Sequence, residues 1–252
     1  MVGGMATIAG AVLAAYIAML GGDDPQARLF YARHLLAASV MAAPATIVIA
    51  KILRPETEES LTRGEVKLTV EKTAHNAIEA AAVGASDGVK LALNVGGMLL
   101  AFIALIALID FPLGWIGEVT GLDQALGQPL SLSLILGYLL APLAWVIGVP
   151  AQDVVTVGGL IGQKVVTNEF VAYTNLNLIK DQLSPQALLI ATYALCGFAN
   201  FSSIAIQLGG IGPLAPERRP DIARFGLRAV LGGTLATMMT ATIAGVLTQM
   251  VP

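Results

Sequence analysis

The sequence GFANFSS, at residues 197–203, places an asparagine and two serines in the middle of an apolar run that extends over residues 188–211. A helix that only crosses a membrane does not need polar side chains at its centre. Irregular backbone at membrane depth survives only where protein buries it or where it lines a cavity, because backbone polar groups need partners there. The stretch therefore predicts a helix that is interrupted near Asn200, with polar side chains that bond the opened backbone or a polar solute.

A second unusual feature is the acid in the sequence TNEF, at residues 167–170, which has short apolar limbs on both sides. A carboxylate at membrane depth is costly and is by default a candidate functional group. Each limb is too short to cross alone, since a spanning helix needs about 20 apolar residues. The pattern predicts a re-entrant helical hairpin over residues 150–182 with its tip at Glu169. A discontinuous helix over residues 185–212 follows it.

The composition indicates an all-α integral membrane protein in a lipid bilayer. Of the 252 residues, 56% are hydrophobic and 12% are charged, whereas soluble domains carry about 25% charged residues. The net charge of −3 gives no argument for nucleic acid. A single cysteine, Cys196, excludes an internal disulfide, and His34 and His75 lie too far apart in the sequence to suggest a metal cluster.

The apolar segments predict about five spanning helices, at residues 1–20, 29–52, 91–109, 188–211 and 225–251. We expect Asp110 and Pro112 to close the third span, and an amphipathic helix at residues 66–83 to lie at the interface. Lysines and arginines place residues 51–72 and 218–228 on the cytoplasmic side. The third span then ends on the outer side, and the span at 188–211 begins there. The chain must therefore cross the membrane an even number of times between Asp110 and Pro185, and a hairpin that enters and leaves from the outer side satisfies this.

The chain also repeats itself in part. The sequences GMATIAG, at residues 4–10, and GFANFSS both place a small polar group within an apolar helix. By the charge rule the two helices run in opposite directions. Inverted repeats with broken helices at the midplane are typical of secondary transporters. We therefore expect residues 1–252 to form a single membrane transport domain with two discontinuous helices.

Four long segments resemble the concentrative nucleoside transporter family. The sequences GQKVVTNEFVAY and LCGFANFSSIAIQLGGIGPLAPERR, at residues 162–173 and 195–219, are similar to its two C-terminal signatures. The sequences GMATIAGAVLAAY and GASDGVKLALNVGGMLLAFIALI, at residues 4–16 and 84–106, match further family segments in the same order. The resemblance implies a bacterial inner-membrane transporter that works by alternating access as a homotrimer.

In that family a first hairpin with a Gln-Thr-Glu tip precedes the first broken helix. Met1 stands just before that helix here. We therefore expect this chain to correspond to the C-terminal portion of a family member, with the first repeat incomplete.

Three polar residues are candidates for binding a ribose. An ionised carboxylate only accepts hydrogen bonds, so Glu169 suits a diol; the alternative is a structural ion pair with Lys164 or Lys180. Asn200 and Ser203 are three residues apart and share one helical face, although both could serve only the broken backbone. We expect Ser202 to point elsewhere and to serve packing.

The resemblance implies further contacts at two apolar residues and at an ion site. Phe198 and Val12 match positions that pack against the nucleoside, and the alternative for each is ordinary helix packing. The hydroxyl of Thr7 and the backbone carbonyl of Ile8 match two ligands of a Na⁺ ion, and hard cations prefer such oxygens. The family usually has serine at the position of Thr7, and its other ligands come from the first hairpin.

These observations favour cation-coupled nucleoside symport, with Na⁺ or H⁺ as the coupling ion and no organic cofactor. We do not expect an enzyme, because the sequence suggests no Ser–His–Asp, Cys–His or metal constellation. One alternative is a non-transporting C-terminal fragment that assembles with full-length transporter subunits. Another is an intramembrane enzyme that uses Glu169 as a base, for which no nucleophile is evident.

Overall fold

The computed structural model describes residues 1–57, 74–211 and 215–250. All regular elements in this part of the chain are helices, which confirms the predicted all-α class. The α-helices are α1 (Val2–Ala6), α2 (Gly10–Gly21), α3 (Pro25–Leu53), α4 (Ala77–Thr120), α5 (Leu122–Leu126), α6 (Leu132–Val146), α7 (Val154–Val166), α8 (Glu169–Ile179), α9 (Pro185–Leu195), α10 (Phe201–Ile211) and α11 (Arg219–Met250). Short 3₁₀ turns lie at Lys180–Gln182 and Pro216–Arg218.

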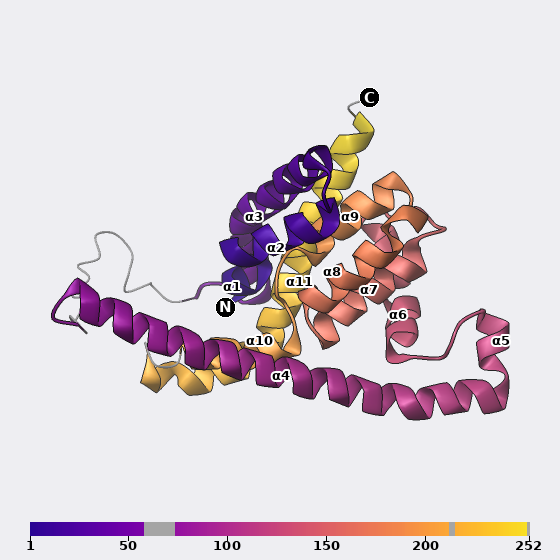
Figure 1. The fold of residues 1–252 in the computed structure, drawn as a ribbon. Helices are drawn as coiled ribbons and strands as arrows, with labels where there is room; N and C mark the ends of the chain where they lie inside the picture. Colours follow the sequence, from indigo (N-terminus) through magenta and orange to yellow (C-terminus); the bar gives the residue numbers. More distant parts are fainter. Residues whose placement is uncertain (58–73, 212–214, 251–252) are drawn as a thin grey trace.

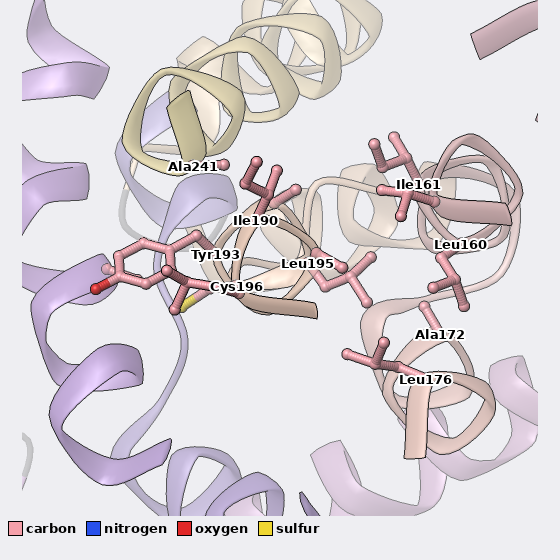
Figure 2. Packing of buried hydrophobic residues seen from close by; sticks show 14 of the residues in the cluster. Leu160, Ile161, Ala172, Leu176, Ile190, Tyr193, Leu195, Cys196 and Ala241 are labelled. Atoms are coloured by element: carbon pink, nitrogen blue, oxygen red, sulfur yellow. The ribbon is translucent and has the colours of Figure 1, made fainter. Parts of the chain in front are cut away.

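Helix α9 lies at the centre of the fold. Its start is fixed by Ser184, whose side chain accepts the backbone N–H of Ala187, and by Pro185 in the first turn. Apolar residues are buried all around the helix, and it contacts α3, α7, α8 and α11. In Figure 2, Ile190 lies toward Ala241 of α11, while Leu195 faces the side chains of α7 and α8. A helix that is hydrophobic on every side belongs in a core.

Helix α4 departs from the compact body and runs along one side of it as a long rod (Figure 1). Several of its large apolar side chains are exposed, including Leu100 at 76% and Phe111 at 80%. Such a surface is available to lipid or to another protein chain.

The prediction that Asp110 and Pro112 end a helix is wrong, because α4 continues through both to Thr120. Asp110 instead accepts the backbone N–H of Leu132 at 2.7 Å, at the start of α6, and so serves another helix. Pro112 removes one backbone donor without ending the helix, which is tolerated in membrane helices. Residues 66–73 of the predicted interfacial helix at 66–83 lie outside the described residues. Residues 77–83 of that prediction form the first part of α4.

Three segments among the described residues are long and apolar enough to cross a membrane: Val2–Gly21, Pro25–Leu53 and Pro216–Gln249. The first of these contains the gap between α1 and α2. The predicted span at 91–109 lies within α4, and the one at 188–211 is divided between α9 and α10. By length and composition the chain is therefore suited to cross a membrane more than once.

Helical geometry stops at three places that approach one another. Residues 7–9 separate α1 from α2, residues 167–168 form the turn between α7 and α8, and residues 196–200 separate α9 from α10. Gly197 adopts φ +144°, and a Cβ built there would lie 2.8 Å from the carbonyl oxygen of Ala6. The break after α9 therefore lies directly against the end of α1.

Candidate functional site

A cavity of about 210 Å³ lies between α2, the start of α8 and the break after α9. It brings together all the residues predicted to contact substrate, and adds others. The lining residues are Val12, Tyr16, Asn168, Glu169, Phe170, Phe198, Asn200, Ser202, Ser203 and Ile206. The cavity thus combines an apolar lining with a cluster of polar groups, which is the usual composition of a small-molecule site.

Glu169 is the first residue of α8, and its carboxylate lies at the positive end of the helix dipole. Its neighbour Asn168 caps the helix by accepting the backbone N–H of Val171 at 2.9 Å. Oε2 of Glu169 accepts a hydrogen bond from Nδ2 of Asn200 at 3.2 Å, and Oε1 accepts one from the Tyr16 hydroxyl at 3.3 Å. Three helical segments therefore converge on one carboxylate.

The alternative role of Glu169, an ion pair with lysine, is not formed within the described part of the chain. Lys164 donates to the carbonyl oxygen of Ala194 at 2.8 Å, and Lys180 donates to the carbonyl oxygen of Leu20 at 2.8 Å. Both lysines thus bond backbone at helix ends. The partners of Glu169 are neutral donors, which a substrate hydroxyl can supplement or replace.

Asn200 serves both the broken backbone and the cavity. Its Oδ1 accepts from the backbone N–H and the hydroxyl of Ser203, at 2.8 Å and 2.9 Å, which caps the start of α10. Its Nδ2 points the other way, to Glu169. The Ser203 hydroxyl also lies against the carbonyl oxygen of Phe198, and it can donate to only one acceptor at a time.

The expectation that Ser202 points away from the site is wrong. Ser202 lines the cavity, and its hydroxyl donates to Oδ1 of Asn200 at 2.7 Å. Ser202 would point away only if one helix continued through residues 200–203. Because Asn200 is instead the cap that precedes α10, its side chain folds back over the first turn and meets both serines.

Sequence reasoning missed Tyr16, which lies one turn after Val12 on α2. It is fully buried, and its ring packs on Tyr173 with a centroid distance of 4.3 Å. This packing directs the hydroxyl toward Glu169. The spacing of four residues from Val12 could have identified Tyr16, since such residues share a helical face.

Thr7 and Ile8 lie in the gap between α1 and α2, where the backbone is not helical. The Thr7 hydroxyl donates its hydrogen to the carbonyl oxygen of Gly3 at 3.0 Å, which leaves its oxygen lone pairs available. A hydroxyl and opened carbonyls are oxygen ligands, and these fit a hard cation such as Na⁺.

A larger cavity, of about 480 Å³, lies between α1, α3 and α11. Its lining is apolar apart from Thr46, Arg54 and Arg228, and Arg54 stacks over the ring of Phe225 at 5.9 Å. It lacks converging hydrogen-bonding groups of the kind that orient a polar solute. The smaller cavity at Glu169 is therefore the better candidate site.

Comparison with known proteins identifies the family. The family model described as the C-terminus of Na⁺-dependent nucleoside transporters matches residues 34–245. The chain belongs to this family. The resemblance that the sequence motifs indicated is thereby confirmed, and the family is one of transporters and not of enzymes.

The chain has relatives in bacteria and in mammals. The chain is 49% identical over 246 residues to the uncharacterized transporter YutK of Bacillus subtilis, covering 97% of the chain and 57% of the relative. It is 42% identical over 264 residues to the sodium/nucleoside cotransporter 1 of Mus musculus, covering 98% of the chain and 38% of the relative. The chain thus spans 57% of the length of YutK and 38% of the length of the mouse cotransporter.

Solved structures share the fold as well. CNTnw in an inward-facing, substrate-bound state matches with a TM-score of 0.78 and 44% identity, covering 98% of this chain and 56% of that one. A CNTnw variant in an intermediate state matches with a TM-score of 0.82 and 44% identity, covering 100% and 58%.

Proposed function

We propose that this chain takes part in Na⁺-coupled nucleoside symport and binds the nucleoside in the cavity at Glu169. The observation that carries the proposal is the convergence of three interrupted segments on that carboxylate. Glu169 comes from the turn between α7 and α8, Asn200 from the break after α9, and Tyr16 from α2. Broken helices around a polar site are the usual arrangement in secondary transporters, where one part of the protein shifts to give alternating access.

The chemistry of the cavity supports a nucleoside as the solute. Carboxylate oxygens of Glu169 accept hydrogen bonds from the two ribose hydroxyls, and the Asn200 amide and the Ser203 hydroxyl complete the polar side. Val12 and Phe198 provide the apolar lining against which a base packs. A solute with a diol at one end and a flat ring at the other fits this division.

Na⁺ is the proposed coupling ion rather than H⁺. The oxygens of Thr7 and Ile8 support it, as do the description of the family and the name of the mouse relative. These two residues would supply only part of a coordination shell, and the bound ion would neutralise the negative end of α1.

The proposed location is the bacterial inner membrane, and the proposed assembly is a homotrimer. The long apolar segments support a bilayer location. The exposed apolar surface of α4 supports contacts with lipid and with other subunits.

Uptake into proteoliposomes tests the proposal. We expect labelled uridine and adenosine to accumulate faster under an inward Na⁺ gradient than under a K⁺ gradient of equal size. Accumulation driven only by a pH gradient would instead assign coupling to H⁺. Absence of uptake by the purified chain, together with its co-purification with full-length YutK, would favour the non-transporting fragment.

We predict that Tyr16→Phe weakens nucleoside binding by about threefold to tenfold. The change keeps the ring and removes a hydrogen bond that orients Glu169, and such a bond contributes roughly 0.5–1.5 kcal/mol. Titration calorimetry with uridine measures the effect, and Tyr138→Phe, at a half-exposed position of α6, is the matched control. Tighter binding by Tyr16→Phe would mean that the hydroxyl competes with the substrate for Glu169.

A further inference from the structure

Lys164 is a positively charged side chain with no exposure at all, in the last turn of α7. Its ammonium donates to the carbonyl oxygen of Ala194 at 2.8 Å and to the hydroxyl of Thr237 at 3.1 Å. Neither partner is charged, and Lys164 forms no ion pair within the described residues. Glu169 acts on this ammonium from beyond ion-pair distance, and burying a charge without a directly bonded counter-ion is costly, so the position of the ammonium needs an explanation.

The position of Ala194 supplies the explanation. Helix α9 ends at Leu195, so the Ala194 carbonyl has no helical N–H partner and lies at the negative end of the helix dipole. The Lys164 ammonium satisfies that carbonyl and places a full positive charge there. Thr237 belongs to a buried row of threonines on α11, with Thr234 and Thr240, and its hydroxyl oxygen accepts the second hydrogen bond of the ammonium.

The same electrostatic situation exists at the end of α1. That helix stops at Ala6, its last carbonyls also point into a break, and the proposed Na⁺ ligands Thr7 and Ile8 follow directly. In the described structure the end of α9 is met by the Lys164 ammonium, whereas residues 7–9, which follow α1, offer the Thr7 hydroxyl and backbone carbonyls and include no lysine or arginine. The two breaks thus differ in what supplies their positive charge.

We infer that Lys164 acts as a built-in cation at the second break. It stabilises the end of α9 as a Na⁺ ion is proposed to stabilise the end of α1, so this half of the transporter requires no ion of its own. The inference rests on the proposed ion site at Thr7 and Ile8. It makes Lys164 a positioning residue for the segment that presents Phe198 and Asn200, without contact to the substrate.

A small substitution at this position should convert the lysine site into an ion site. Lys164→Ser removes the ammonium and leaves the Ala194 carbonyl, the Thr237 hydroxyl and the new hydroxyl around the vacated space, all of which are ligands for a hard cation. In detergent with choline chloride, we expect the thermal unfolding midpoint of the purified Lys164→Ser variant to be lower than that of the wild type. Replacing choline with Na⁺ should raise it by roughly 3–6 °C more than in the wild type.

Two further variants separate this role from packing. Lys164→Met fills the space without charge or oxygen, and we expect it to be destabilised equally in Na⁺ and in choline. Lys90→Ser on the exposed surface of α4 should respond to Na⁺ as the wild type does. If Lys164→Ser cannot be purified in choline, the monodisperse fraction recovered after extraction in Na⁺ and in choline gives the same comparison.

Equal loss of stability in Na⁺ and choline for Lys164→Ser would overturn the inference, as would wild-type stability of Lys164→Met in choline. These measurements use no nucleoside, so they stand apart from the test of symport. A wild-type chain that fails to take up nucleosides would contradict the proposed function while leaving the unfolding result intact.

Discussion

Nucleoside affinity is expected to fall by about tenfold or more when Glu169 is replaced by glutamine. The carboxylate accepts hydrogen bonds on both oxygens, and charge-assisted bonds are roughly twice as strong as neutral ones. Loss of such an acceptor costs roughly 1.5–3 kcal/mol. Glutamine keeps the shape of the side chain but turns an amide donor toward Tyr16 or Asn200, both of which already donate to this residue. Titration calorimetry with uridine measures the change.

The matched control is Glu118→Gln, which makes the same chemical change at an exposed position of α4. Ser202→Ala would be a poor control, because Ser202 bonds Asn200 within the cavity. A 2′,3′-dideoxynucleoside sharpens the test, since it cannot donate to the carboxylate. The wild type should discriminate strongly against this ligand and Glu169→Gln much less. Undiminished discrimination in the variant would place the ribose elsewhere.

The positions of the chain breaks could be predicted because they are costly in an apolar setting. An asparagine or an acid within a long hydrophobic run needs a partner at membrane depth, so the polar residues at 167–169 and 200–203 mark the places where helices stop. The structure ends α7 at Val166 and begins α10 at Phe201, beside these residues. Glu169 and Asn200 are both candidates on this ground, and the structure brings their side chains within hydrogen-bond distance.

What the sequence could not show depends on contacts between helices. In the sequence alone, Asp110 resembles a residue that ends a helix. In the structure its side chain accepts the backbone N–H of Leu132 at the start of α6, and α4 continues past it. Tyr16 resembles an ordinary aromatic packing residue until the packing against Tyr173 aims its hydroxyl at Glu169. The sequence suggests Lys164 only as a partner for that acid, because no local pattern reveals that the end of α9 reaches it.

The largest effect on stability is expected at Gly197, where the two breaks meet. Its φ of +144° is a backbone conformation that residues with a side chain rarely adopt. A Cβ at this position would lie 2.8 Å from both the carbonyl carbon and the oxygen of Ala6, and 3.0 Å from the oxygen of Met5. These are backbone atoms, so no side chain can rotate out of the way. Any substitution must push α1 away from the break after α9.

Gly197→Ala should therefore lower the free energy of unfolding through two effects. Backbone strain costs about 1–3 kcal/mol, and overpacking adds roughly the same amount. The thermal unfolding midpoint should fall by on the order of 10 °C. Because Ala6 directly precedes Thr7, the displacement should also move the proposed Na⁺ ligands, and the Na⁺ dependence of nucleoside affinity should weaken.

The control makes the same change where the backbone and the surrounding space allow it. Gly209 lies in α10, and no atom approaches within 4 Å of a Cβ built there. Gly209→Ala should raise stability by about 0.5–1 kcal/mol, since glycine is unfavourable in a helix. Opposite signs for the two variants would assign the effect to the contact between the breaks rather than to the added methyl group. A Gly197→Ala protein that unfolds at the wild-type temperature and keeps its full Na⁺ dependence would mean that the breaks do not need to touch, and that the ion and the nucleoside communicate by another route.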